Sequence, residues 1–250
     1  MFELTISTCK SKSSDISFIY KALKNKVKSL KGIIVCSEYE GRSSLAIAID
    51  KEKKDFLFAM VFEAISEAII RSYKFDFLKN NLKLRVGDKI TESAFIKALT
   101  VYDKNSDKDL IKKQLVPSEE ILIDSFYNFR LWELEKRWKG VCELMSENAS
   151  YLFMSGSFMD LLKFLILSCD NEAGEVHMHL GDGNIYCNEP SGRELFNMIF
   201  NDDENSKINI LSELICLSPE KIVLHSNLEN TSLAKDIVSL FDGRVSQIKK

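Results

Sequence analysis

The chain has 250 residues, 45% of them hydrophobic and 28% charged, with a formal net charge of −3. This hydrophobic fraction is ample for a core, and the length fits one large domain or two small ones. No segment approaches 18 uncharged apolar residues, the N-terminus lacks the apolar run of a signal peptide, and the six cysteines form no C-x-x-C pair. We therefore expect a cytoplasmic protein with reduced thiols and no transmembrane segment.

Charge is distributed unevenly along the chain. Residues 1–116 contain 22 Lys/Arg and 15 Asp/Glu, whereas residues 117–250 contain 12 Lys/Arg and 22 Asp/Glu. Such asymmetry indicates two functional halves, or two lobes that attract each other. We therefore predict a basic N-terminal region, 1–116, and an acidic C-terminal region, 117–250, that meet at Pro117.

The first fifty residues predict a small β-α-β-β unit. Apolar residues alternate over 2–6, which is typical of a strand. A helix follows, capped by Asp15 and ended by Gly32. Two further strands, 33–36 and 45–49, predict a hairpin around Glu40-Gly41. Beyond residue 55 the apolar spacing becomes helical, and it predicts helices over 56–73, 92–101 and 107–115.

Two helices after Pro117 are predicted to organise the rest of the chain. Ser118 is a suitable N-cap for an amphipathic helix that reaches Glu147, with a bend near Lys139-Gly140. A second helix, over 158–167, is apolar nearly all round and is expected to be buried.

The last third of the sequence predicts a hairpin followed by an α-β-α-β tail. The hairpin joins strands 176–180 and 185–187 through a glycine-rich turn. The tail consists of a helix over 208–217, a strand over 221–225, a helix over 231–241 and a strand over 245–248. A right-handed crossover makes the last two strands parallel. The whole chain is thus predicted to be α+β, with the small N-terminal unit, a helical middle, and a C-terminal mixed sheet covered by helices.

Three histidines are the first candidate for a chemical site. His177 and His179 share one face of a predicted strand and could meet His225 on a neighbouring strand as metal ligands. The alternative is that they are ordinary exposed or hydrogen-bonded histidines. The sequence enforces neither a third ligand nor a nucleophile with its base, so we predict no catalytic residue, no cofactor and no metal.

Lysines on the first helix are the one candidate binding surface. Lys21, Lys24, Lys28 and Lys31 follow one another at steps of three, four and three, which places them on one helical face. This face could bind an anionic partner, either nucleic acid or a membrane surface, or it could simply be solvated. Trp132 and Trp138 could offer a stacking surface to a partner, but we expect both to be core residues.

The second half of the chain resembles the YtxC-like sporulation protein family. The residues that carry the resemblance are Phe126-Tyr127-Asn128-Phe129-Arg130-Leu131, the stretch 158–170, Val176-His177-Met178 and the stretch 211–225, which ends in Leu217-Ser218-Pro219-Glu220-Lys221-Ile222-Val223-Leu224-His225. The resemblance implies a role in sporulation, in the cytoplasm of the mother cell or forespore. It implies no mechanism and no functional residue.

These observations favour a non-enzymatic binding or scaffold protein that acts in sporulation, most simply with a protein partner. The alternative is an enzyme or nucleotide-binding regulator whose site is assembled from residues far apart in the sequence. Converging polar groups around the three histidines would favour the alternative.

Overall fold

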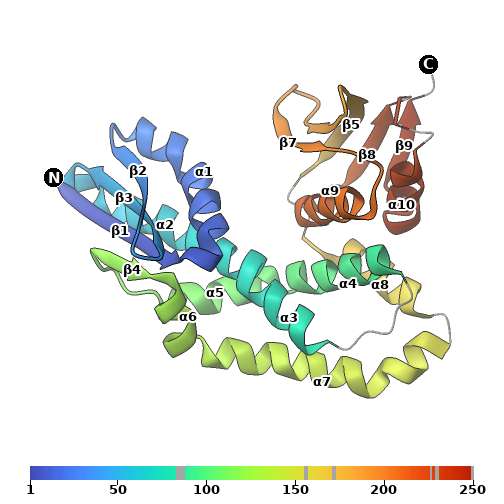
Figure 1. Ribbon diagram of the computed structural model, residues 1–250, viewed down its shortest axis with the longest axis horizontal. Coiled ribbons are helices and arrows are strands. Elements are labelled where there is room, and N and C mark those ends of the chain that lie inside the picture. Colours follow the sequence, from blue (N-terminus) through green and yellow to red (C-terminus); the bar gives the residue numbers. More distant parts are fainter. Residues whose placement is uncertain (83–87, 155–156, 171–172, 226, 229–230, 249–250) are drawn as a thin grey trace. The chain divides into compact units, whose positions relative to one another are not determined.

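The computed structural model describes the chain except for residues 83–87, 155–156, 171–172, 226, 229–230 and 249–250 (Figure 1). Its contacts divide the chain into two compact units. Unit 1 consists of Met1–Asn81 and Lys104–Glu143, and unit 2 consists of Leu82–Asp103 and Leu144–Lys250. The predicted α+β class is confirmed, with one mixed sheet in each unit. The division at residue 116 stays a prediction, because compactness does not show which segments act separately.

Sheet A, the sheet of unit 1, has the strand order β2-β3-β1-β4. Its strands are β1 (Phe2–Cys9), β2 (Ile33–Tyr39), β3 (Arg42–Ile49) and β4 (Glu120–Leu122). β1 is antiparallel to β3 and parallel to β4, and β2 and β3 form the predicted hairpin. The hairpin turns at Glu40 and Gly41, whose φ angles of 47° and 77° are typical of a two-residue type I′ turn.

The helices of unit 1 pack against sheet A and against one another. They are α1 (Ser13–Ser29), α2 (Lys54–Ala68), a π-helical turn (Ile69–Lys74), α3 (Phe75–Asn81), α5 (Lys104–Gln114), α6 (Ile123–Arg130) and the first part of α7 (Trp132–Met154). Strand residues that point toward α1 and α2 are almost fully buried, among them Leu4, Ile6, Leu45 and Ile47. The predicted helices over 56–73 and 107–115 are confirmed.

The first helix ends three residues earlier than Gly32. It ends at Ser29, and Lys31 adopts the left-handed conformation with φ 59°. The amides of Lys31 and Gly32 then donate to the carbonyls of Lys28 and Val27, which is the Schellman arrangement. Gly32 is needed for space, because a Cβ there would lie 2.6 Å from Cγ2 of Ile49.

The predicted helix from Ser118 to Glu147 is wrong at its start and in its continuity. Residues 120–122 form β4 instead, because they pair with β1. Helix α6 then ends at Arg130, and Leu131 separates it from α7. α7 continues through Gly140 without a break.

A buried ionic cluster joins the helices of unit 1. Nζ of Lys74 lies 2.8 Å from Oδ2 of Asp107, and the two side chains are only 6% and 2% exposed. The indole Nε1 of Trp138 donates to the same oxygen over 3.0 Å. Nearby, Lys104 and Lys108 both pair with Glu67. These contacts connect the π-helical turn, α2, α5 and α7.

Unit 2 is built on sheet B, with the strand order β7-β6-β5-β8-β9. Its strands are β5 (Glu175–Gly181), β6 (Asn184–Asn188), β7 (Glu194–Ile199), β8 (Lys221–His225) and β9 (Val245–Ile248). β5, β6 and β7 are antiparallel neighbours, whereas β5, β8 and β9 are parallel. The predicted hairpin and the parallel last strands are confirmed, but the sequence analysis did not identify β7.

Helices complete unit 2. In the described residues they are α4 (Lys89–Val101), the last part of α7, α8 (Ser157–Ser168), α9 (Glu204–Leu217) and α10 (Ser232–Leu240). Helix α9 connects β7 to β8 and helix α10 connects β8 to β9, and Figure 1 shows both helices on the same side of sheet B. α4 packs against α9 and α8. None of the helices in the described residues is long and apolar enough to cross a membrane.

Helix α8 is buried on one side only. Phe158, Leu162 and Leu165 are at most 5% exposed, but Phe164 and Leu167 are 57% and 46% exposed. The expectation that this helix is buried all round is therefore wrong. The six cysteines are all free, and four of them are buried.

Candidate functional site

The three histidines come together on the face of sheet B opposite α9 and α10. Along β5 the buried Val176 and Met178 alternate with His177 and His179. Because β8 is parallel to β5 with His177 opposite Val223, His225 emerges on the same face as His177. We call the side chains of Glu175, His177, His179, Tyr186, Lys221 and His225 the histidine face.

Hydrogen bonds connect four of these side chains in a row. Nδ1 of His177 lies 3.1 Å from Nε2 of His225, and Nε2 of His177 lies 2.8 Å from Oε1 of Glu175. Lys221 donates to the other oxygen of Glu175 over 2.6 Å. Since the carboxylate can only accept, His177 donates from Nε2, and a neutral His177 ring then accepts at Nδ1 from Nε2 of His225. For neutral rings, this row fixes both tautomers.

His179 occupies the remaining part of the face. Its ring stacks on Tyr186, with centroids 5.0 Å apart and an interplanar angle of 10°. It meets the ring of His225 edge-on, with centroids 6.0 Å apart. Among the described residues, stacking rather than hydrogen bonding therefore holds the third histidine.

The electrostatics of the histidine face keep His225 neutral. Burial lowers the pKa of His225, and the neighbouring His177 and His179 lower it further. Hydrogen bonds from Lys221 and His177 lower the pKa of Glu175, which stays ionised. The side chains of His177 and Glu175 are 27% and 34% exposed, so the face remains accessible to solvent.

The chemistry open to this face is proton uptake and polar recognition. In the described part of the chain, no serine, threonine or cysteine side chain hydrogen-bonds to any of the three histidines. Nor do three or more His, Cys, Asp or Glu side chains there form a group that could hold a metal ion. The histidines do converge as considered from the sequence, but as a hydrogen-bonded pair and a stacked ring.

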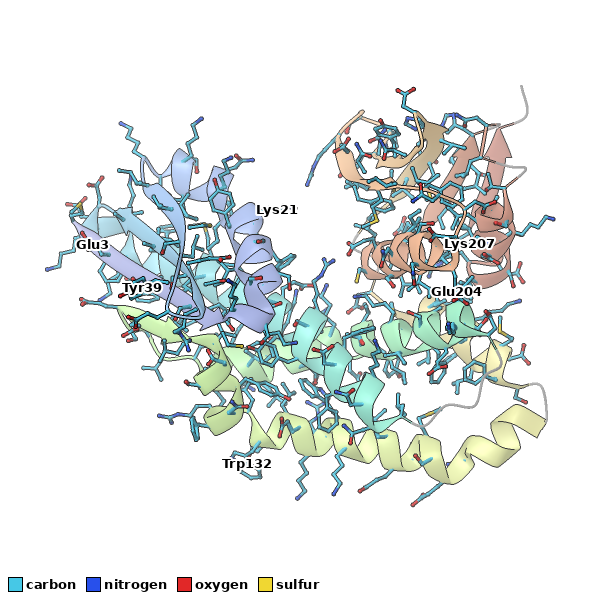
Figure 2. All side chains as sticks on the ribbon, viewed as in Figure 1. Glu3, Lys21, Tyr39, Trp132, Glu204 and Lys207 are labelled. Carbon is cyan, nitrogen blue, oxygen red and sulfur yellow. The ribbon has the colours of Figure 1, made fainter. Side chains whose placement is uncertain are left out.

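The predicted lysine face consists of three residues on α1 and one beyond it. Lys21, Lys24 and Lys28 lie on the helix and are exposed, whereas Lys31 follows the helix end in the left-handed conformation. None of the four makes an ion pair among the described residues. Figure 2 labels Lys21 on the first helix of unit 1. Unit 1 as a whole has 22 Lys/Arg against 18 Asp/Glu, so its excess charge is positive.

Exposed aromatic side chains mark the junction of α6 and α7. Phe129 is 78% exposed and Trp132 is 61% exposed, and Arg130 between them is exposed too. Trp132 projects from the start of α7 in Figure 2. Trp138 is 2% exposed, so the expectation of a core residue is right for Trp138 and wrong for Trp132. We call Phe129, Arg130 and Trp132 the aromatic joint.

A buried polar cluster near the start of α1 was not anticipated as a site. Asp15 is 5% exposed, and its Oδ2 has no hydrogen-bond partner among the described residues. Burial raises the pKa of Asp15 to about 6, while Lys12 and a hydrogen bond with Ser72 act in the opposite direction. Lys12 itself donates to Ser72 over 2.8 Å and lies above the ring of Tyr73. No sequence signal pointed to this cluster, because its halves are about sixty residues apart.

Comparison with known proteins places most of the chain in one family. A family model described as the YtxC-like family matches residues 61–246. This match covers the aromatic joint and the histidine face but not the lysine face. No curated protein and no solved structure matches the chain. The chain belongs to the YtxC-like family.

Proposed function

We propose that this chain is a non-enzymatic binding or scaffold protein that acts in the cytoplasm during sporulation, and that a protein partner docks on its aromatic joint. The observation that carries the proposal is the exposure of two large aromatic side chains, Phe129 at 78% and Trp132 at 61%. Large apolar side chains that gather on a surface are typical of interaction sites. Tryptophan and arginine are also the residues most enriched among energetic hot spots of interfaces.

The aromatic joint is held rigidly from its inner side. Leu131 and Leu134 are at most 2% exposed and belong to the core of unit 1. Tyr127 and Trp138 also lie on this buried side, with ring centroids 6.3 Å apart. A surface supported in this way loses little conformational entropy on binding. The partner that fits is a protein with an apolar groove for the two rings and an acidic rim for Arg130.

The binding role is tested with a surface variant and a matched control. Phe129→Ala/Trp132→Ala removes both rings, and His179→Ala/Tyr186→Ala removes two rings from the histidine face. Each variant is used to capture proteins from sporulating cells, and the captured protein is then purified and its affinity for each variant is measured directly. We expect the joint variant to weaken binding at least tenfold, or about 1.4 kcal/mol, while the control binds as the wild type does.

The sporulation role is tested with the same two variants in cells. In a strain lacking the chromosomal copy, the wild type and the control should restore the spore count, whereas the joint variant should not. Equal binding and equal spore counts for a correctly folded joint variant would contradict the proposal.

A second candidate function is binding of nucleic acid through the lysine face. The observation in its favour is that Lys21, Lys24 and Lys28 are exposed together and pair with no carboxylate in the described structure. Three phosphate contacts would give a double-logarithmic salt slope of about −2.7 for duplex DNA, since each contact contributes about −0.9. A fourth contact by Lys31 would raise it to about −3.6.

The matched control for the lysine face has the same charge change elsewhere on unit 1. Changing Lys21, Lys24 and Lys28 to Gln should abolish the salt-dependent binding. Changing the exposed Lys113, Lys136 and Lys139 to Gln should preserve it. Binding to anionic vesicles but not to DNA would assign the face to a membrane surface, and absence of both at low salt would leave it a solvated face.

A further inference from the structure

Strand β2 is an edge strand that lacks a bulge, a proline and a lysine, three common protections against further pairing. Protein sheets protect their edges with short strands, bulges, prolines or lysines. Among the described edge strands, β4 has three residues and follows Pro117, β7 pairs through a bulge near Asn188, and β9 has four residues. β2 has seven residues, pairs regularly with β3, and contains neither proline nor lysine.

The side chains of β2 also leave apolar surface exposed. Ile33, Val35 and Tyr39 lie on the face of sheet A opposite α1, and they are 67%, 55% and 74% exposed. Figure 2 labels Tyr39 at the hairpin end of this strand. Residues with high β propensity thus lie along a free edge.

The hairpin geometry determines which backbone groups face the free edge. In a two-residue type I′ hairpin, the closing pair, Tyr39 and Arg42, exchanges hydrogen bonds. Going back along β2 from Tyr39, every second residue is therefore hydrogen-bonded to β3. The intervening residues, Ile34, Cys36 and Glu38, direct their N–H and C=O groups outward from the sheet.

We propose that β2 pairs antiparallel with β2 of a second copy of this chain, with Cys36 at the two-fold axis. In this register the outward-facing Ile34 lies opposite the partner's Glu38, and Cys36 lies opposite the partner's Cys36. All seven residues of each strand are paired, with about six main-chain hydrogen bonds. The two sheets join into one eight-stranded sheet, and the closed two-fold arrangement leaves no further β2 edge free.

The surface of β2 is self-complementary in this register. Ile33 of one copy lies opposite the partner's Tyr39, so the exposed apolar side chains of both copies form one patch. Charge also matches, because Lys31 precedes the strand and Glu40 follows it. Antiparallel pairing brings Lys31 next to the partner's Glu40 at both ends. This complementarity favours a second copy over an unrelated strand.

The oligomeric state and a cysteine cross-link test the proposal. By sedimentation from about 1 to 100 µM, we expect a reversible dimer in the wild type, and a monomer for Val35→Lys, in which two ammonium groups would lie within the patch. The control, Val116→Lys, makes the same change at another exposed valine of unit 1 and should leave the dimer intact. A cooperative thermal unfolding transition in both variants shows that each is folded.

Cross-linking tests the register separately. Cys36 is exposed, so mild oxidation or a short bismaleimide should join two copies through Cys36, as identified by peptide mass spectrometry. Moving the thiol by one residue in Cys36→Ser/Ser37→Cys should strongly reduce the cross-link, because Ser37 lies opposite the partner's Val35. A monomer at about 100 µM, or a dimer that Val35→Lys does not dissociate, would overturn the proposal.

Discussion

The two units differ in how deeply they bury their ionisable side chains. In unit 1 the pair Lys74 and Asp107 is 6% and 2% exposed, and Asp15 is 5% exposed. In unit 2 the row through Glu175, His177 and His225 lies on the histidine face, where side chains are about a third exposed. In a buried ion pair the attraction between the two charges is strong, and loss of one partner strongly destabilises the fold. In an exposed pair, solvent weakens both the attraction and the destabilisation. Charges should therefore contribute strongly to stability in unit 1 and only weakly in unit 2.

The largest effect is expected from breaking the buried pair. Among the described residues, Lys74→Met leaves the buried Asp107 with Trp138 and Arg137 as its polar partners, and it should lower the free energy of unfolding by about 3–5 kcal/mol. The matched change in unit 2, Lys221→Met, removes a half-exposed partner of Glu175 and should lower the free energy of unfolding far less. Urea unfolding of both variants measures the difference. Similar losses would show that the two units do not differ in this respect.

The stability of unit 2 should instead depend on apolar packing. Leu162→Ala in α8 removes a fully buried side chain and should cost about 2–5 kcal/mol, as should Leu165→Ala. The control is Phe164→Ala in the same helix, where the ring is 57% exposed and little stability should be lost. Equal denaturant midpoints for Leu162→Ala and the wild type would show that the buried side of α8 is misassigned.

Asp15 gives unit 1 a pH dependence of definite sign. Its pKa is about 6 in the fold against 3.8 as the ordinary value, so between about pH 4 and 6 the folded chain binds more protons than the unfolded chain. Stability therefore falls as pH rises through this window, by up to about 3 kcal/mol. Asp15→Asn should flatten the profile and raise stability at pH 7 by about 1–3 kcal/mol.

The control for Asp15 is an aspartate in the first turn of another helix. Asp55 is exposed at the start of α2, so Asp55→Asn should leave the pH profile unchanged. A flat wild-type profile between pH 4 and 6 would contradict the burial of the Asp15 carboxyl group.

Local patterns were sufficient to predict most of the elements. The alternation of apolar residues along β5 predicted its two faces. The glycine-containing turns of both hairpins were also predicted, and in the structure Glu40, Gly41, Asp182 and Gly183 adopt the positive φ angles that such turns require. Elements formed through distant pairing were missed. β4 has only three residues and is a strand because it pairs with β1, more than a hundred residues earlier.

The candidate sites were less predictable than the fold. The histidines could be placed on one face from their spacing, but the row to Glu175 and Lys221 depends on the register between β5 and β8. The exposure of Trp132 depends on the break at Leu131, which the continuous apolar spacing through this region does not reveal. A single sequence shows which residues share a face but not which faces remain uncovered.

The smallest effect, and the one that completes the comparison, is expected at His225. Burial and the neighbouring histidines lower its pKa below 6.5, so under acidic conditions the unfolded chain binds the proton more readily. The resulting stability is fully present above about pH 6.5 and is lost as pH falls, opposite in sign to the effect of Asp15. This contribution of His225 should amount to less than about 1 kcal/mol because the face is solvated.

The contribution of His225 is best measured in the Asp15→Asn variant, which lacks the opposing pH dependence of Asp15. In that variant, adding His225→Gln should make the loss of stability below pH 6.5 shallower. A proton NMR titration that placed the pKa of His225 above 6.5 would show that the histidine face attracts protons, and the contrast in sign between the two units would then disappear.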